Sequence, residues 1–248
     1  MDEIDSLLLL SGNDIPFVEL GLSIHNPTLK EIALMGEENF FTGYQMLCVS
    51  KNLLTVEDKV NLDDITNFDI LIAILKERNA VMQKNKYCVE MLLAILFQDC
   101  EIAFKDKEIS LTYKEEVHTL NSSNFDNFQT ILKKMFNTGD ENDSSNPNPA
   151  GQYSKKIAEK LRKRHQKLAE LKPNDQPSGV LNRYISVLAI GLSLSINEVM
   201  NFTMYQLFDQ IQRYELKIGY DIHIQAKMAG ASDLKDPEDW MKDIHPKN

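Results

Sequence analysis

The fold is decided between residues 180 and 230, in the stretch VLNRYISVLAIGLSLSINEVMNFTMYQLFDQIQRYELKIGYDIHIQAKMAG. It contains two Ser/Thr-x-x-Glu/Gln patterns, Ser195–Glu198 and Thr203–Gln206. In such a capping box the hydroxyl and the Glu or Gln side chain each accept a free backbone N–H, which starts a helix. Gly230 is a natural helix stop, because glycine adopts the left-handed conformation at no steric cost. The stretch therefore predicts two short helices followed by one long helix from Thr203 to Gly230.

The long helix carries one apolar stripe at three- and four-residue spacing, which is typical of an amphipathic helix. The stripe consists of Met204, Leu207, Phe208, Ile211, Tyr214, Ile218, Ile222 and Gln225. Two interpretations stay open: a core helix, or a face kept for a partner helix or a second copy of the chain. For a partner face, we predict binding by Leu207, Phe208, Ile211, Tyr214, Ile218 and the tail residue Trp240. Gly219 lies inside this helix, where it either costs about 1 kcal/mol relative to Ala or marks a close packing contact.

Composition limits the class of protein. The chain has 248 residues, a formal net charge of -10 and a pI near 5.0, which disfavours non-specific binding to nucleic acid. Its three cysteines lack CxxC spacing, which is typical of reduced thiols in a cytosolic protein. No basic region precedes the leucines at 7–10, and the later run MLLAILF is too short to span a bilayer. We expect a soluble intracellular protein without a membrane partner.

The remainder of the chain predicts a mostly α fold with small β-hairpins near the N-terminal half. Alternating residues indicate hairpins at Phe17–His25 and Cys100–Tyr113. Helices are expected at residues 29–36, 40–54, 63–82 and 125–136, with a last helical turn after Asp236, while residues 87–97 fit either a helix or a strand. Thr138–Gly151 is rich in Pro, Asn, Ser and acidic residues, and we predict a linker there. The expected organisation is an α+β module at residues 1–137, a polar linker at 138–152 and a helical module at 153–248.

Catalytic and metal-binding patterns are missing from the sequence. The histidines are scattered, at His25, His118, His165, His223 and His245. A metal site needs three or four converging ligands, and no such spacing occurs. The sequence holds no GxGxxG, GxxxxGK[ST], GxSxG or HExxH motif. We therefore expect a protein that is not an enzyme and that uses no cofactor or metal.

One basic stretch stands out in this acidic chain, between Lys155 and Leu171. Its basic residues are Lys155, Lys156, Lys160, Arg162, Lys163, Arg164 and Lys167, around a seam of Ile157, Leu161, Leu168 and Leu171. Three interpretations stay open: a solvated helix that neutralises acidic neighbours, a phosphate-contacting helix, or a helix that binds a partner through its seam. No aromatic residue interleaves the basic ones, so stacking on single-stranded nucleic acid is not supported.

Two stretches resemble proteins of large tailed phages of Gram-positive hosts. They are PFVELGLSIHNPTLKEIALMGEENFF at residues 16–41 and FTMYQLFDQIQRYELKIGYDIHIQAKMAGASDLKDPEDWMKDIH at residues 202–245. Together they are similar to the tail assembly chaperones encoded near the tape measure gene, while the basic stretch departs from that family. The resemblance implies a helical protein of the host cytoplasm that coats the tape measure protein and recruits tail tube subunits before leaving the virion. The rival hypotheses are a nucleic-acid-associated regulator that uses residues 155–171 and a structural virion component of the tail or baseplate.

Overall fold

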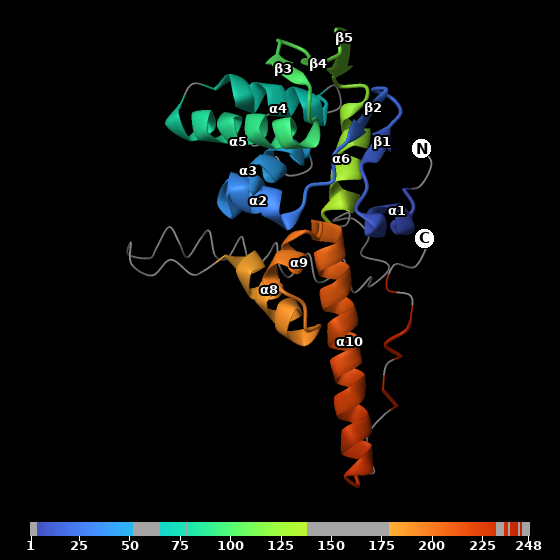
Figure 1. Ribbon diagram of the computed structural model, residues 1–248. Helices are drawn as coiled ribbons and strands as arrows, with labels where there is room; N and C mark the ends of the chain where they lie inside the picture. The colour runs from blue at the N-terminus through green and yellow to red at the C-terminus, as the bar shows by residue number, and fades with distance from the viewer. Residues whose placement is uncertain are drawn as a thin grey trace. The chain divides into compact units, whose positions relative to one another are not determined.

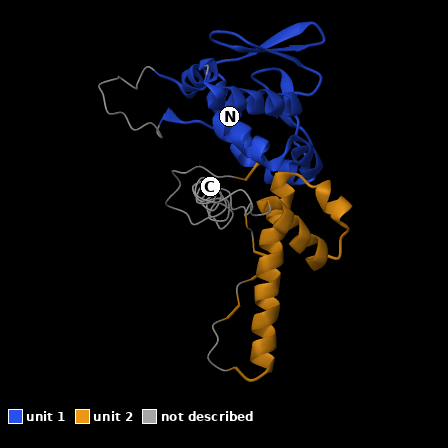
Figure 2. Ribbon diagram, turned by 90° about the vertical axis from the view of Figure 1, so that its left-hand side faces the viewer, with its two compact units in different colours: residues 1–135 blue, residues 136–248 orange. Residues whose placement is uncertain are grey.

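The computed structural model describes residues 4–51, 65–77, 79–137, 179–231, 236–237, 239–242 and 244. The chain divides into two compact units, Met1–Met135 and Phe136–Asn248 (Figure 2). Within the described residues there are nine helices and two small antiparallel sheets (Figure 1). The predicted fold class, mostly α with small β-hairpins, is therefore confirmed. The linker predicted at residues 138–152 and the basic stretch at 155–171 lie outside the described residues.

Unit 1 begins with a short helix and a hairpin. Helix α1 (Ser6–Ser11) is followed by β1 (Ile15–Phe17) and β2 (Leu22–Ile24), with Phe17 opposite Leu22. Gly21 closes the loop with a φ of 67°, a left-handed conformation that glycine adopts without strain. The hairpin predicted around Gly21 is confirmed.

The helices of unit 1 differ in their bounds from those that the sequence predicted. They are α2 (Leu29–Met35), α3 (Glu37–Leu47), α4 (Asn67–Lys76), α5 (Ala80–Leu96) and α6 (Phe125–Met135). The helix predicted at residues 63–82 is wrong as one element, because α4 ends at Lys76 and the side chain of Asn79 caps a new helix. The ambiguous run at residues 87–97 belongs almost entirely to α5.

The second sheet holds one strand that the sequence did not predict. Its order is β3 (Glu101–Phe104), β4 (Ile109–Tyr113) and β5 (Glu116–Leu120). The hairpin predicted at residues 100–113 corresponds to β3 and β4. The loop from β4 to β5 has two residues, Lys114 and Glu115, with positive φ angles of 47° and 71°. Such loops are usually recognised by Asn-Gly or Asp-Gly, and neither pair occurs here.

An aromatic cluster on α6 forms the centre of unit 1. The ring of Phe128 lies 6.2 Å from that of Phe17, 5.7 Å from that of Phe97 and 6.1 Å from that of Phe125. All four side chains are buried. The cluster joins β1, the end of α5 and α6, so residues distant in sequence share one core.

Unit 2 contains the three helices predicted from residues 180–230. They are α8 (Val180–Gly191), α9 (Ile196–Met200) and α10 (Met204–Met228). Both predicted capping boxes are present, with Ser195 and Glu198 opening α9 and Thr203 and Gln206 opening α10. Gly230, just past the end of α10, has a φ of 97°. The helical turn predicted after Asp236 is wrong for the described part of the tail, which contains no helix. The residues there form one non-helical turn, in which the Lys242 N–H donates to the Asp239 carbonyl at 3.3 Å.

Candidate partner-binding site

Helix α8 packs along the first part of α10 and stops there. The rings of Tyr184 and Phe208 meet edge to face at 6.3 Å. At the end of α8, a Cβ on Gly191 would lie only 2.2 Å from Cζ of Tyr214, so the tyrosine ring rests on the α8 backbone. Beyond Tyr214, α10 continues to Met228, a rise of about 21 Å (Figure 1).

The inner half of α10, Met204–Gln212, is buried. Its buried side chains are Met204, Tyr205, Leu207, Phe208, Asp209, Ile211 and Gln212. Three of the predicted partner-binding residues lie here, with exposed fractions of 0% for Leu207, 8% for Phe208 and 3% for Ile211. Their burial favours the core interpretation, since a docking face must be accessible. Partner binding by these three residues stays a prediction.

The outer half of α10, Arg213–Met228, has no buried residue. Tyr214 is half-buried beneath α8. Past it, the apolar stripe continues into solvent, with Ile218 38% exposed and Ile222 60% exposed. We call Ile218 and Ile222 the outer stripe. A Cβ on Gly219 would meet nothing within 4 Å, so this glycine marks no packing contact.

The C-terminal tail returns to α10. Arg213 donates from Nη1 to the carbonyl of Lys242 at 2.7 Å and to that of Trp240 at 3.4 Å. Near the other end of α10, Lys227 Nζ lies 2.8 Å from Asp236 Oδ1. The structure therefore brings the half-buried Trp240 to α10, as one of the predicted partner-binding residues. Arg213 and Ile218 are five positions apart, which separates them by about 140° around the helix, so the tail and the outer stripe occupy different faces.

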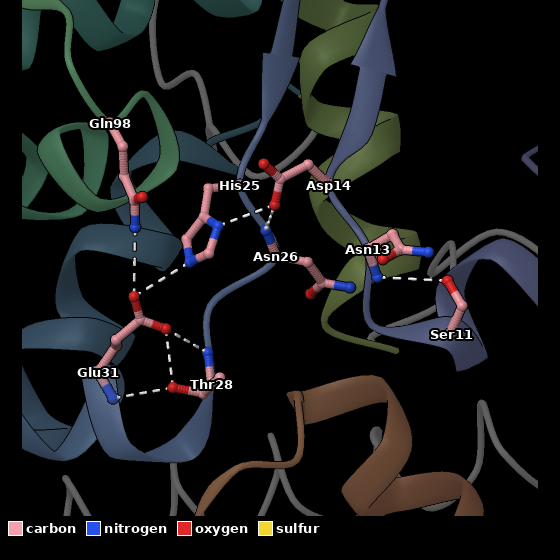
Figure 3. Close-up of polar contacts among 8 residues, drawn as sticks. All are labelled: Ser11, Asn13, Asp14, His25, Asn26, Thr28, Glu31 and Gln98. Atoms are coloured by element: carbon pink, nitrogen blue, oxygen red, sulfur yellow. Dashed lines mark hydrogen bonds and ion pairs between the residues drawn. The ribbon is translucent and has the colours of Figure 1, made fainter.

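Unit 1 contains a polar cluster that is an alternative candidate site (Figure 3). Nδ1 of His25 lies 2.8 Å from Asp14 Oδ1, and Nε2 lies 3.1 Å from Glu31 Oε1. Gln98 also donates to Glu31 Oε1, at 3.2 Å. Both imidazole nitrogens are thus engaged, which leaves neither free for a substrate or a metal. The cluster is a clamp that joins β2, α2 and the turn after α5.

The capping box of α2 fixes the charge of this clamp. Partial burial raises the pKa of Glu31, but hydrogen bonds from the backbone and hydroxyl of Thr28, together with nearby His25, outweigh it. The pKa of Glu31 therefore lies below its usual value. An ionised Glu31 can accept from Thr28, His25 and Gln98 at once, because a carboxylate offers about four lone-pair positions.

Metal sites, membrane-spanning helices and disulfides are further possibilities among the described residues. No group of three or more His, Cys, Asp or Glu side chains is arranged there to hold a metal ion. Among the described helices, none is both long and apolar enough to cross a membrane. Cys48, Cys88 and Cys100 form no disulfide. The predicted phosphate-contacting residues, Lys155, Lys156, Lys160, Arg162, Lys163, Arg164 and Lys167, lie outside the described part of the chain.

Two residues with a role on α10 were not identified from the sequence. Arg213 lies outside the predicted apolar stripe, and the two carbonyls in the tail that accept its hydrogen bonds are 27 and 29 positions away. Gly191 was not singled out, although its lack of a side chain admits the ring of Tyr214. Both depend on long-range partners, which periodicity does not indicate.

Residues 173–245 match the protein family described as YomV second domain, a phage-derived family. The matched range takes in α8, α9, α10 and the tail, and it covers well under half of the chain. The similarity is consistent with a phage protein. No curated protein and no solved structure matches the chain.

Proposed function

We propose that the protein is a non-enzymatic tail assembly chaperone of a phage. It binds the helical tape measure protein through the outer stripe of α10 and assists assembly of tail tube subunits in the host cytoplasm. The observation that supports this most is the reach of α10 about 21 Å beyond its packing on α8, with the apolar stripe uncovered. The similarity of this region to a phage-derived family supports the part of the proposal that makes it a phage protein.

The outer stripe suits a helical partner because it continues the line along which α8 packs. Phe208 and Tyr214 contact α8, and Ile218 follows four positions later. A helix placed where α8 ends would meet Ile218 and Ile222 at the same three- and four-residue spacing. An amphipathic helix with an apolar seam is therefore the partner of matching chemistry.

The outer stripe is small, which fits a protein that acts in many copies. Burying one isoleucine contributes about 1.5–3 kcal/mol, and both residues are already partly covered, so a single contact is weak. Many weak contacts along one long partner produce strong overall binding by multivalency. The net charge of -10 keeps such a protein soluble before it meets its partner.

The test is a pull-down of the full-length protein with fragments of the tape measure protein. Ile218→Asp combined with Ile222→Asp should abolish binding and leave the helical circular dichroism unchanged, because both side chains are exposed. Leu34→Asp is the matched control, since Leu34 is 81% exposed on α2 in the other unit. Failure of the wild-type protein to bind any fragment would contradict the proposal, as would equal loss in the control.

The rival functions give different results. A nucleic-acid-associated regulator would bind DNA or RNA with a steep salt dependence, and neutralising Arg162, Lys163 and Arg164 would remove that affinity. A structural virion component would remain in purified virions, where mass spectrometry detects it. The proposed chaperone should be absent from them and should bind nucleic acid without a steep salt dependence.

A further inference from the structure

Helix α8 covers only part of the line on α10 that carries the outer stripe (Figure 1). Along the inner half, α8 lies on this line through its contacts with Phe208 and Tyr214. Past Tyr214 the same line is open, with Ile218 38% exposed and Ile222 60% exposed. A helix that covers the outer stripe must therefore lie in line with α8 and beyond its end.

A second copy of the chain carries a helix of the required length and pattern. Its own outer half, Arg213–Met228, rises over the same distance of about 21 Å and presents the same two isoleucines at a four-residue spacing. A parallel copy would bring its inner half into the position that α8 occupies. An antiparallel copy directs its inner half away from α8, so only the antiparallel orientation fits the end of α8.

Antiparallel pairing of identical helices makes every contact twice, about a two-fold axis. With the axis at Tyr220, Ile218 lies level with the second copy's Ile222, and Ile222 lies level with the second copy's Ile218. The four isoleucines then cover one another at the centre of the contact. The same register brings Met228, which is 84% exposed, to the turn of α10 where the second copy's α8 ends.

The charges beside the outer stripe are self-complementary in this register. Lys217 Nζ lies 2.6 Å from Asp221 Oδ2 within one helix, and both side chains are about half exposed. Asp221 lies about 60° and Lys217 about 100° around the helix from Ile218, on the same side. In an antiparallel pair these sides meet, and Lys217 comes within two residue steps, about 3 Å along the axis, of the second copy's Asp221. The two carboxylates lie equally close to each other, but a lysine flanks them at each end, so each carboxylate has two ammonium groups nearby.

Gly219 lies on the other side of the outer stripe, next to the proposed axis. A glycine inside a helix is destabilising, and within one chain a Cβ at this position would meet nothing within 4 Å. In the antiparallel pair the two Gly219 residues lie only about 3 Å apart along the axis. Their missing side chains let the two helices approach closely, which gives this glycine a role that no contact within the chain supplies.

We propose that two copies of the chain form a homodimer through the outer halves of their α10 helices, paired antiparallel about a two-fold axis near Tyr220. The inference goes beyond the proposed function and does not depend on it. The contact is small, so the dimer should dissociate at about micromolar concentration or above. Because the second copy and a tape measure helix use the same outer stripe, the dimer and that complex exclude each other.

Sedimentation equilibrium of the full-length protein over about a hundredfold range of concentration measures the pairing. The wild-type protein should pass from monomer to dimer as its concentration rises. Ile218→Asp combined with Ile222→Asp should stay monomeric over the same range, because four carboxylates would meet at the centre of the contact. A wild-type protein that stays monomeric throughout, or that forms a trimer, would overturn the proposal.

Exchange of charges tests whether the partner is a second copy in this register. Lys217→Asp gives each helix two acidic residues and Asp221→Lys gives it two basic residues, so each variant alone should associate at least about tenfold more weakly. An equimolar mixture of the two should recover the association, because an acidic helix then meets a basic one. Lys86→Asp is the matched control, since Lys86 also pairs with an acid four positions later, Glu90 on α5. Wild-type association by both single variants, or no recovery in the mixture, would overturn the proposed pairing.

Cross-linking tests the orientation of the two helices. Gly219→Cys places thiols about 3 Å apart along the axis, whereas Gln225→Cys places them ten residue steps, about 15 Å, apart. A short bismaleimide should therefore link Gly219→Cys into dimers and leave Gln225→Cys largely monomeric. The wild-type protein, with Cys48, Cys88 and Cys100, measures the background. Equal cross-linking of both variants would mean a parallel pair and would overturn the proposal.

The dimer and the proposed function fail in different ways. If the protein dimerises as described and binds no tape measure fragment, the proposed function is wrong and the dimer stands. If it binds fragments but stays monomeric at every concentration, the dimer alone is wrong. If fragments bind and leave the dimer intact, they do not use the outer stripe, and the proposed binding mode is wrong. Helical circular dichroism of each variant confirms that it folds.

Discussion

The two halves of α10 share one apolar pattern, but neighbouring elements bury that pattern in the inner half and leave it exposed in the outer half. The apolar stripe passes from Ile211 in the inner half to Ile218 in the outer half without a change of spacing, yet Ile211 is 3% exposed and Ile218 is 38% exposed. The inner half even buries the polar side chains of Asp209 and Gln212, each 5% exposed. Periodicity thus identifies the apolar face, while the length of the neighbouring helix α8 decides whether that face is core or surface.

The largest expected effect comes from placing the same charge in each half. Ile211→Asp should destabilise unit 2 by more than about 4 kcal/mol, because it loses a buried side chain and places a carboxylate in an apolar site. Ile218→Asp should change stability by less than about 1 kcal/mol, since the site is exposed. Urea unfolding followed by circular dichroism measures both. Equal losses would mean that the outer half is also core.

The junction between the halves gives the next largest effect. Gly191→Ala places a methyl group where the Tyr214 ring now lies, at 2.2 Å from Cζ, so the ring or α8 must move. We expect a loss of about 1–3 kcal/mol, as for overpacked cores. In a Tyr214→Ala background the same change should cost nothing, because the obstacle is gone. A cost that persists in that background would place the strain in the α8 backbone.

Much of this architecture is local in origin, and that part could be predicted. The capping boxes at Ser195 and Thr203 each involve residues three positions apart, so the sequence alone located the starts of α9 and α10. The α10 stripe is equally local. The strand β5 was missed because Lys114 and Glu115 form its tight loop without glycine or asparagine.

Long-range contacts decide which of the predicted partner-binding residues are buried and which are exposed, and the sequence does not indicate these contacts. The end of α8 at Gly191 separates buried Ile211 from exposed Ile218. The Arg213 contact with the tail joins groups 27 and 29 positions apart, which no helical period links. Such pairings arise from the packing of whole elements, so a single sequence without partners for comparison leaves them open.

A smaller effect separates the caps of α9 and α10 by their response to acid. Hydrogen bonds from the Ser195 backbone and hydroxyl lower the pKa of Glu198 below its usual 4.5, whereas the α10 box uses the neutral Gln206. Because the pKa of Glu198 is lowered in the folded state, its ionised carboxylate stabilises α9 above about pH 4.5. This stabilisation is lost as the pH falls through the lowered pKa. The pH dependence therefore concerns only α9, the helix that precedes the inner half of α10.

Two cap variants measure this difference. Thr203→Ala should cost about 1 kcal/mol at neutral and at acid pH alike. The cost of Ser195→Ala should be present at neutral pH and should shrink as the pH falls through the lowered pKa of Glu198, because protonated Glu198 no longer completes the box. Urea titrations across this range give both values. A Ser195→Ala cost that stays constant with pH would contradict the role of the Glu198 charge.

The smallest effect tests whether anything packs on the outer half near Gly219. A Cβ at this position meets no atom within 4 Å, so Gly219→Ala adds a methyl group to open space and removes the conformational cost of glycine in a helix. We expect stabilisation of up to about 1 kcal/mol, opposite in sign to Gly191→Ala. Thermal unfolding followed by circular dichroism at the same protein concentration compares the two variants. Binding to tape measure fragments should be retained, because Gly219 lies at the edge of the outer stripe, about 100° around the helix from Ile218 and about 60° from Ile222, and a methyl group there is small. Loss of binding without loss of stability would mean that the partner's backbone approaches α10 at Gly219, and that the docking surface extends beyond Ile218 and Ile222.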